Sequence, residues 1–238
     1  MISQTNISYQ YNNQTFEGVL VSPNNVTNKL PALLMTPNWL GITKEAIDLA
    51  TQQAEKGYIV FIVDLYGKTV RPENSQQASE AMTPLKENRQ DLRQRMNKAL
   101  DILLKEINID KQKIAAFGFC FGGCCALELA RSGANIKAAI SFHGNLDTPN
   151  TRDAQNIKSS ILVLNGANDP MIPDDQITDF FNEMKSAPAV DWQFINYGGA
   201  VHGFTDVTAN DPEVKQYNAK VSKRAFNAMN TLLDELFK

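Results

Sequence analysis

Short apolar runs recur along the chain, and their composition is that of strands buried on both faces. These runs cover residues 32–35, 58–63, 114–117, 136–142, 160–164 and 192–197. Near the N-terminus, apolar and polar residues alternate over 2–10 and 15–21, with the polar tract 11–14 between them. Alternation with a period of two indicates half-buried strands, so we expect an antiparallel hairpin at the edge of a sheet.

Helical periodicity fills the segments between the apolar runs. It covers 43–56, a long amphipathic stretch from Pro84 onward, the residues after Gly123, 177–184 and about 212–237. Strands that alternate with helices predict an α/β fold with a mostly parallel central sheet and helices on both faces. We expect residues 1–238 to form a single α/β-hydrolase domain, with ligands bound beyond the carboxyl ends of the strands.

Two polar segments remain to be interpreted. Residues 68–84 form either a short cap over a site or a surface loop. The arginines of the next helix, Arg89, Arg93 and Arg95, are interpreted as a solvated face.

The segment 113–125, KIAAFGFCFGGCC, carries the strongest chemical signal. An apolar strand is followed at once by Cys120, with Gly118 two residues before it and Gly122 two residues after it, and then by a helix. This is the spacing of a nucleophile elbow with cysteine in place of serine. The helix N-terminus directs free N–H groups at the sulfur, which favours a thiolate. G-x-C-x-G alone is common, and most cysteines are small core residues.

A thiol nucleophile needs a base, and the base needs an orienting acid. Of the two histidines, His202 lies between glycines after the last strand, whereas His143 directly follows an earlier strand and could equally be structural. The order Cys120, Asp169, His202 is that of α/β-hydrolases, and each residue follows a different strand. Asp169 is preferred over Asp147, Asp174 and Asp175; Asp147 is either a turn residue or lines the pocket.

Composition narrows the class of partner. The net charge of −3 offers no reason to expect nucleic acid or an anionic membrane. No run approaches the length of a membrane span, and the polar N-terminus lacks the apolar core of a signal peptide. The three cysteines are crowded together rather than spaced as a disulfide framework. We therefore expect a cytoplasmic protein, either monomer or homodimer.

The motifs in combination resemble the dienelactone hydrolase family of α/β-hydrolases. The resemblance is carried by GFCFGG at 118–123, VDLYG at 63–67, GANDP at 166–170, HGF at 202–204 and PNWLG at 37–41. It implies a Cys-Asp-His triad, and an oxyanion hole built from the backbone N–H groups of Phe121 and Trp39. Two positions depart from dienelactone hydrolase itself. Asn38 replaces a glutamate that contacts the cysteine, and Asp206 replaces an arginine that binds a substrate carboxylate.

These features predict a hydrolase that cleaves a small-molecule ester or lactone through Cys120, with no metal or organic cofactor. Asn38, Phe119, His143 and Phe204 are expected in the substrate pocket. Asn38 either favours the thiolate or hydrogen-bonds its own loop. The alternative function is a ligand-binding or thiol redox-sensing protein without turnover, since three cysteines within six positions make oxidation plausible.

Overall fold

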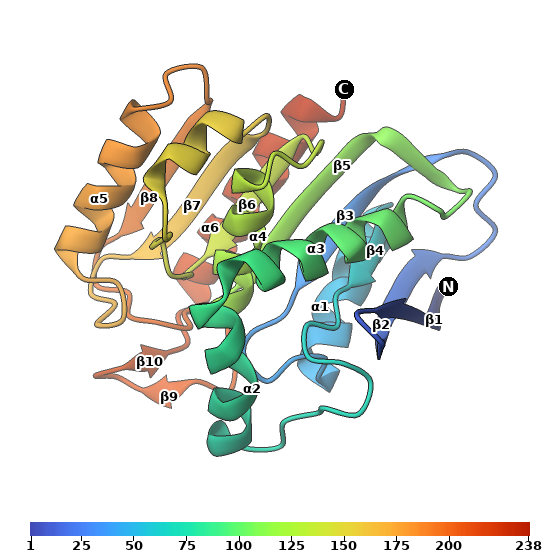
Figure 1. The fold of residues 1–238 in the computed structure, drawn as a ribbon, viewed down its shortest axis with the longest axis horizontal. Helices are drawn as coiled ribbons and strands as arrows, with labels where there is room; N and C mark the ends of the chain where they lie inside the picture. The colour runs from blue at the N-terminus through green and yellow to red at the C-terminus, as the bar shows by residue number, and fades with distance from the viewer.

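The centre of the molecule is an eight-stranded sheet in the order β1-β2-β4-β3-β5-β6-β7-β8 (Figure 1). The structure, a computed structural model, describes all residues 1–238. The strands are β1 (Ile2–Tyr11), β2 (Gln14–Pro23), β3 (Leu30–Thr36), β4 (Ile59–Ile62), β5 (Ile109–Phe119), β6 (Ala138–Phe142), β7 (Ser160–Gly166) and β8 (Trp192–Tyr197). Strands β3 to β8 pair in parallel, whereas β1 and β2 form an antiparallel hairpin at one edge. The predicted sheet and edge hairpin are confirmed.

Helices cover both faces of this sheet. On one face lie α3 (Arg89–Leu103), α4 (Phe121–Arg131) and α5 (Asp174–Lys185), and on the other lie α1 (Lys44–Glu55) and α6 (Ala219–Leu236). Each layer has its own apolar core, represented by Leu92 and Leu127 on the first face and by Ala50 and Met229 on the second. The inner strands are continuous apolar runs because both of their faces are covered in this way.

Two predicted helix starts are wrong. The helix expected from Pro84 is preceded by a separate helix, α2 (Ser75–Glu87), which begins where the Asn74 side chain accepts the N–H of Gln77 at 3.0 Å. Pro84 lies in the last turn of α2. The chain then turns at Asn88, whose side chain accepts the N–H of Asp91 and begins α3. Much of 68–84 is thus helical, and none of it lines the cavity described below.

The C-terminal helix begins at Ala219 instead of about residue 212. The preceding residues form a small two-stranded sheet of β9 (Asn210–Asp211) and β10 (Lys215–Gln216). The N–H of Gln216 donates to the carbonyl of His202 at 3.0 Å. These backbone pairings outweigh helical periodicity, and the helix starts only at its cap, Asn218.

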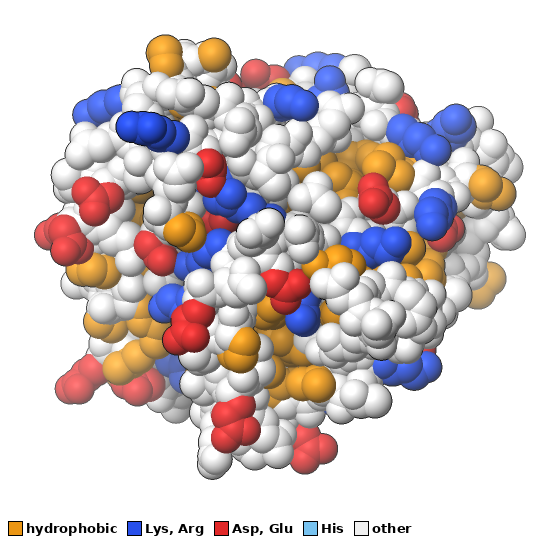
Figure 2. All heavy atoms as spheres, viewed as in Figure 1, with side chains coloured by type: hydrophobic (Ala, Val, Ile, Leu, Met, Phe, Trp, Pro, Cys, Tyr) orange, Lys and Arg blue, Asp and Glu red, His pale blue; other side chains and the backbone are white.

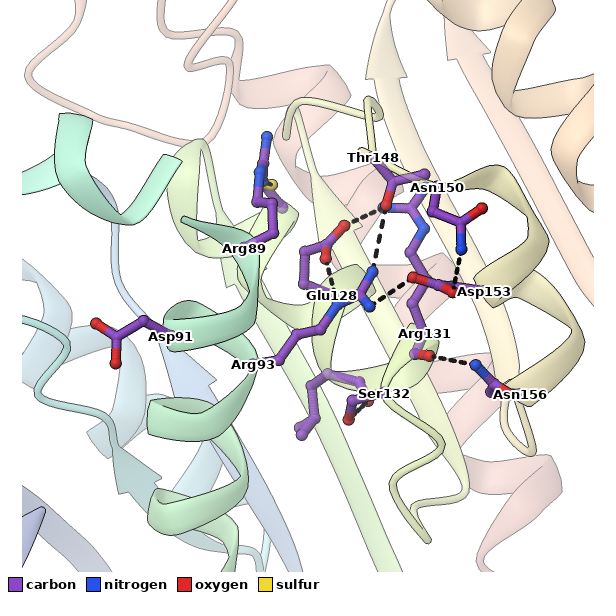
Figure 3. Close-up of polar contacts among 12 residues, drawn as sticks. Arg89, Asp91, Arg93, Glu128, Arg131, Ser132, Thr148, Asn150, Asp153 and Asn156 are labelled. Atoms are coloured by element: carbon purple, nitrogen blue, oxygen red, sulfur yellow. Dashed lines mark hydrogen bonds and ion pairs between the residues drawn. The ribbon is translucent and has the colours of Figure 1, made fainter. Parts of the chain in front are cut away.

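The interpretation of the α3 arginines as a solvated face is also wrong. Arg89 is buried, and the side chains of Arg93 and Arg95 are mostly covered. Figure 3 shows Arg93 reaching toward α4 and toward the 3-10 helix η1 (Thr151–Asn156). It donates to Glu128 at 2.7 Å and to Asp153 at 2.6 Å. These ion pairs join α3 to α4 and η1, so the charges on this face of α3 are internal.

The surface carries mixed charge. In Figure 2, Lys and Arg side chains are interspersed with Asp and Glu side chains over the visible face, without a broad field of one sign. This pattern fits the small net charge of −3. No helix combines the length and the apolar content needed to cross a bilayer.

Candidate active site

The turn from β5 into α4 places Cys120 in a strained backbone conformation. Its φ is 54° and its ψ is −121°, a region that residues other than glycine rarely adopt. The flanking glycines are required by close backbone approach. A Cβ on Gly118 would lie 2.1 Å from the carbonyl oxygen of Gly122, and a Cβ on Gly122 would lie 2.1 Å from that of Thr36. The sequence-predicted elbow therefore has the expected strand, apex and helix.

The N-terminus of α4 is open toward this apex. No side chain caps the helix, and the first N–H groups of a helix, which include that of Phe121, have no acceptor within it. The sulfur of Cys120 thus stands beside unpaired donors and the positive end of the helix dipole.

Asp169 and His202 are brought together by the loops after β7 and β8. His202 Nδ1 lies 2.7 Å from Asp169 Oδ2, and both side chains are buried. The other carboxylate oxygen of Asp169 accepts the N–H of Met171 at 2.8 Å, which fixes the acid in place. Burial opposes protonation of His202. The hydrogen bond to Asp169 and the proximity of the Cys120 sulfur nevertheless raise its pKa from 6.5 to about 10.

His143 lies against His202 but has the opposite electrostatic character. Its Nε2 lies 2.8 Å from Thr205 Oγ1, and its ring meets that of His202 edge-on with centroids 5.0 Å apart. Burial, together with the charge of His202, lowers the pKa of His143 well below its usual value. At neutral pH this pair therefore holds one positive charge, on His202.

These groups share one cavity of about 400 Å³. Cys120, His143, His202, Asn38, Trp39 and Phe119 all line it, together with residues of α1 and of the segment 203–208. Phe204 does not reach the cavity as expected, because it is fully buried behind His143 with ring centroids 4.9 Å apart. A larger hollow of about 670 Å³ borders α5 and includes Asp147, but none of the Cys120, Asp169 and His202 side chains lies there. Asp147 instead accepts a hydrogen bond from Arg89 at 2.8 Å.

The loop after β3 starts beside the elbow and lines the same cavity. The side-chain oxygen of Asn38 accepts the N–H of Leu40 at 2.9 Å, and its carbonyl accepts the N–H of Gly41 at 2.9 Å. The oxygen of the Asn38 amide is therefore hydrogen-bonded within its own loop, which is the second of the two roles that the sequence suggested for Asn38. The N–H of Trp39 has no acceptor in the chain.

Two contacts of the site were not anticipated from the sequence. Thr205, which holds His143, is separated from it by 62 positions and belongs to no motif. Tyr66 donates its hydroxyl to the carbonyl of Trp39 at 2.9 Å. The VDLYG motif flagged the segment of Tyr66 but not this contact. No group of His, Cys, Asp and Glu side chains is arranged to hold a metal ion.

The geometry of the elbow and the paired acid and histidine agrees with comparisons to known proteins. The family model described as "Dienelactone hydrolase family" matches residues 16–237. The chain belongs to the dienelactone hydrolase family. Its membership identifies it as an ester or lactone hydrolase with the α/β-hydrolase fold.

Solved structures of the family superimpose over the whole chain. A structure named m3DLH is 33% identical with a TM-score of 0.94, over 100% of this chain and 99% of that one. A dienelactone hydrolase-like promiscuous phosphotriesterase from metagenomic libraries is 31% identical with a TM-score of 0.93, over 99% and 98%. A Bradyrhizobium protein named as a probable 2-oxo-3-(5-oxofuran-2-ylidene)propanoate lactonase is 26% identical over 190 residues, 75% of each chain.

Proposed function

We propose that this dienelactone hydrolase family member cleaves a small carboxylic ester or lactone through a covalent intermediate on Cys120, and that residues 1–238 act as one catalytic domain. The observation that carries the proposal is the 2.7 Å contact between Asp169 and the His202 ring, which lines the same cavity as Cys120. A nucleophile, a base and an orienting acid, each on a different loop, form the arrangement that acyl transfer needs.

In the first half of the reaction, Cys120 attacks the substrate carbonyl carbon as a thiolate, its proton already held on His202 Nε2. The carbonyl π electrons move to oxygen, where the N–H groups of Trp39 and Phe121 stabilise the oxyanion. One such donor is worth about 3 kcal/mol of transition-state stabilisation. The intermediate then collapses, the carbon–oxygen bond to the leaving group breaks, and the leaving oxygen takes the proton from His202.

In the second half, neutral His202 removes a proton from water as the water oxygen attacks the thioester. Collapse of the second tetrahedral intermediate breaks the carbon–sulfur bond. The sulfur leaves as a thiolate, His202 keeps the proton that it took from water, and the carboxylic acid departs. The raised pKa of His202 supports this resting ion pair, because the ring holds a proton readily while Asp169 and the sulfur are beside it.

The charge of the cavity bears on the substrate. Its lining includes Glu45, Asp48 and Asp206, with Lys215 as the only lysine and no arginine. A carboxylate-bearing substrate would therefore meet net negative charge, so neutral esters and lactones are the favoured class.

Phosphotriesters are a second substrate class. They are neutral, as this lining favours, and the phosphotriesterase named above is 31% identical over nearly the whole chain. Cys120 would attack phosphorus and displace an alkoxide or aryloxide, and water would then release the sulfur.

The test is a stopped-flow assay with p-nitrophenyl acetate, followed by mass spectrometry of the trapped protein. We expect a burst of one p-nitrophenolate per chain, steady turnover, and an acetyl group on Cys120. Cys120→Ala should lose all three while remaining folded. Cys124→Ala and Cys125→Ala are matched controls, because both sulfurs are fully buried in α4 and should keep the burst. An acetyl group on Cys124 or Cys125 would contradict the proposal. Labelling without turnover would favour the binding or redox-sensing alternative.

A further inference from the structure

The VDLYG segment, residues 63–67, lies directly behind the loop that follows β3. The N–H of Val63 donates to the carbonyl of Met35 at 2.9 Å, so the end of β4 is tied to the end of β3. Asp64 is almost fully buried, and its Oδ1 accepts the N–H groups of Tyr66 at 3.1 Å and Gly67 at 3.0 Å. The carbonyl of Tyr66 accepts from Gln14 at 2.7 Å. The Tyr66 backbone is therefore fixed from both sides.

The Tyr66 side chain links this fixed backbone to residues 38–41, the loop that follows β3. The ring is 5% exposed and lies against Gly41, where an added Cβ would sit 3.6 Å from it. The hydroxyl donates to the carbonyl of Trp39 at 2.9 Å. Burial, followed by the nearby sulfurs of Cys125 and Cys120, raises the pKa of Tyr66 far above its usual value. The hydroxyl is thus a donor throughout the working pH range.

The loop has no other comparable anchor. Its remaining hydrogen bonds join Asn38 to Leu40 and to Gly41, and these shape the turn without attaching it to the rest of the molecule. Among the hydrogen bonds of residues 38–41, the one from Tyr66 is the only bond that comes from outside the loop. Trp39 thus has its carbonyl fixed from behind while its N–H remains free.

We propose that Tyr66 is a positioning residue for the oxyanion hole: its hydrogen bond to the Trp39 carbonyl sets the orientation in which the Trp39 N–H meets the substrate oxygen. The inference rests on the proposed function. An oxyanion donor is effective only when it is already aimed at the position that the developing charge will occupy. Tyr66 itself does not touch the substrate, because it does not line the cavity.

The test compares two reactions of the same sulfur in Tyr66→Phe. Acylation by p-nitrophenyl acetate passes through an oxyanion, whereas alkylation by iodoacetamide is a direct displacement that forms none. Since one oxyanion donor contributes roughly 10²–10³ in rate, misaligning it should lower the burst rate about tenfold. The alkylation rate and its pH profile should stay unchanged. Mass spectrometry would check that the label is on Cys120, the only cysteine that is not fully buried.

Tyr9→Phe is the matched control. Tyr9 is buried to a similar degree and donates to the carbonyl of Asp64 at 3.3 Å, but it makes no hydrogen bond with residues 38–41. Its loss should leave the ratio of acylation to alkylation at the wild-type value. An unchanged ratio in Tyr66→Phe, or an equal fall of both rates, would overturn the inference.

If Tyr66→Phe does not fold, Gln14→Met offers a second route, because it removes only the bond to the Tyr66 carbonyl. The acylation rate should then fall two- to threefold relative to alkylation, and an unchanged ratio would count against the positioning role. The proposed function would fail separately, through a wild-type chain with no burst or a burst that survives in Cys120→Ala.

Discussion

Buried polar groups lie at both ends of α4, but they are fully hydrogen-bonded at one end and partly unpaired at the other. At the far end, Arg131 donates to Glu183 at 2.8 and 2.6 Å, to Glu128 at 2.9 Å and to the carbonyl of Leu146 at 2.8 Å. At the near end, His202 Nε2, His143 Nδ1 and the Trp39 N–H have no hydrogen-bond partner in the chain. Native interiors rarely leave such groups unpaired.

The difference separates a structural role from a chemical one. Around Arg131 every strong donor has an acceptor, so the charges hold α4, α5 and the loop after β6 together. Around Cys120 the unpaired groups face a cavity, where a substrate and water can complete the hydrogen bonds. A buried cluster of donors and acceptors without hydrogen-bond partners thus indicates the site more clearly than charge or burial alone.

Removing the proposed base, His202, should have the largest effect on catalysis. His202→Ala should lower kcat by about 10⁴ or more, because no other group can take the thiol proton. His143→Ala should cost far less, since the ring is neutral and already bonded to Thr205. Steady-state kinetics on purified, folded variants would check this. The reverse ranking would place the base on the loop after β6.

Disrupting the Arg131 ion pairs at the C-terminal end of α4 should reduce stability without changing catalysis. Arg131→Met leaves Glu183 buried without its cation and removes one of the two cations of Glu128, which should cost about 3–5 kcal/mol of unfolding free energy. Urea denaturation would measure the loss. Below the midpoint, kcat per folded molecule should match wild type. Lys44→Met, which breaks an exposed pair with Asp48, is the control and should change stability little.

The pH dependence of stability should show how much the His202 cation stabilises the folded chain. The pKa of His202 is raised from 6.5 to about 10, so the folded chain keeps a proton that the unfolded chain releases between these values. Its stabilising contribution is full below pH 6.5 and is lost as pH rises through 10. The unfolding free energy of wild type relative to His202→Gln should fall between pH 6 and 10. A difference that stays flat over this range would show that His202 is neutral in the folded state.

The smallest expected effect is at Asn38. Asn38→Glu places a carboxylate on the cavity wall near the sulfur, and like charge disfavours a thiolate. The pH at which iodoacetamide alkylation is half-maximal should rise by about one unit. Asn38→Gln changes the length of the side chain without adding charge and should leave that pH unchanged. Equal shifts in both variants would assign the effect to the loop.

Features that depend on neighbouring residues could be predicted from the amino-acid sequence. The elbow is readable because strand, apex cysteine and glycines lie within a few positions, and the backbone strain at Cys120 demands them. The sheet and its edge hairpin could be predicted because both patterns are local. The hairpin strands alternate apolar and polar residues, and the inner strands are uninterrupted apolar runs. The order Cys120, Asp169, His202 added the acid and base, and the structure brings Asp169 and His202 into contact.

Contacts between polar groups far apart in the chain could not be predicted in this way, because they depend on how the segments pack. Arg131 and Glu183 are 52 positions apart, and Tyr66 and Trp39 are 27 apart, so no local pattern pairs them. The α3 arginines have the periodicity of an exposed face, yet α4 and η1 supply carboxylates to Arg93 and the loop after β6 supplies Asp147 to Arg89. The start of α6 was set by backbone pairing between β10 and the His202 loop. A sequence pattern reports what a segment prefers, whereas burial and hydrogen bonding depend on which segments pack against it.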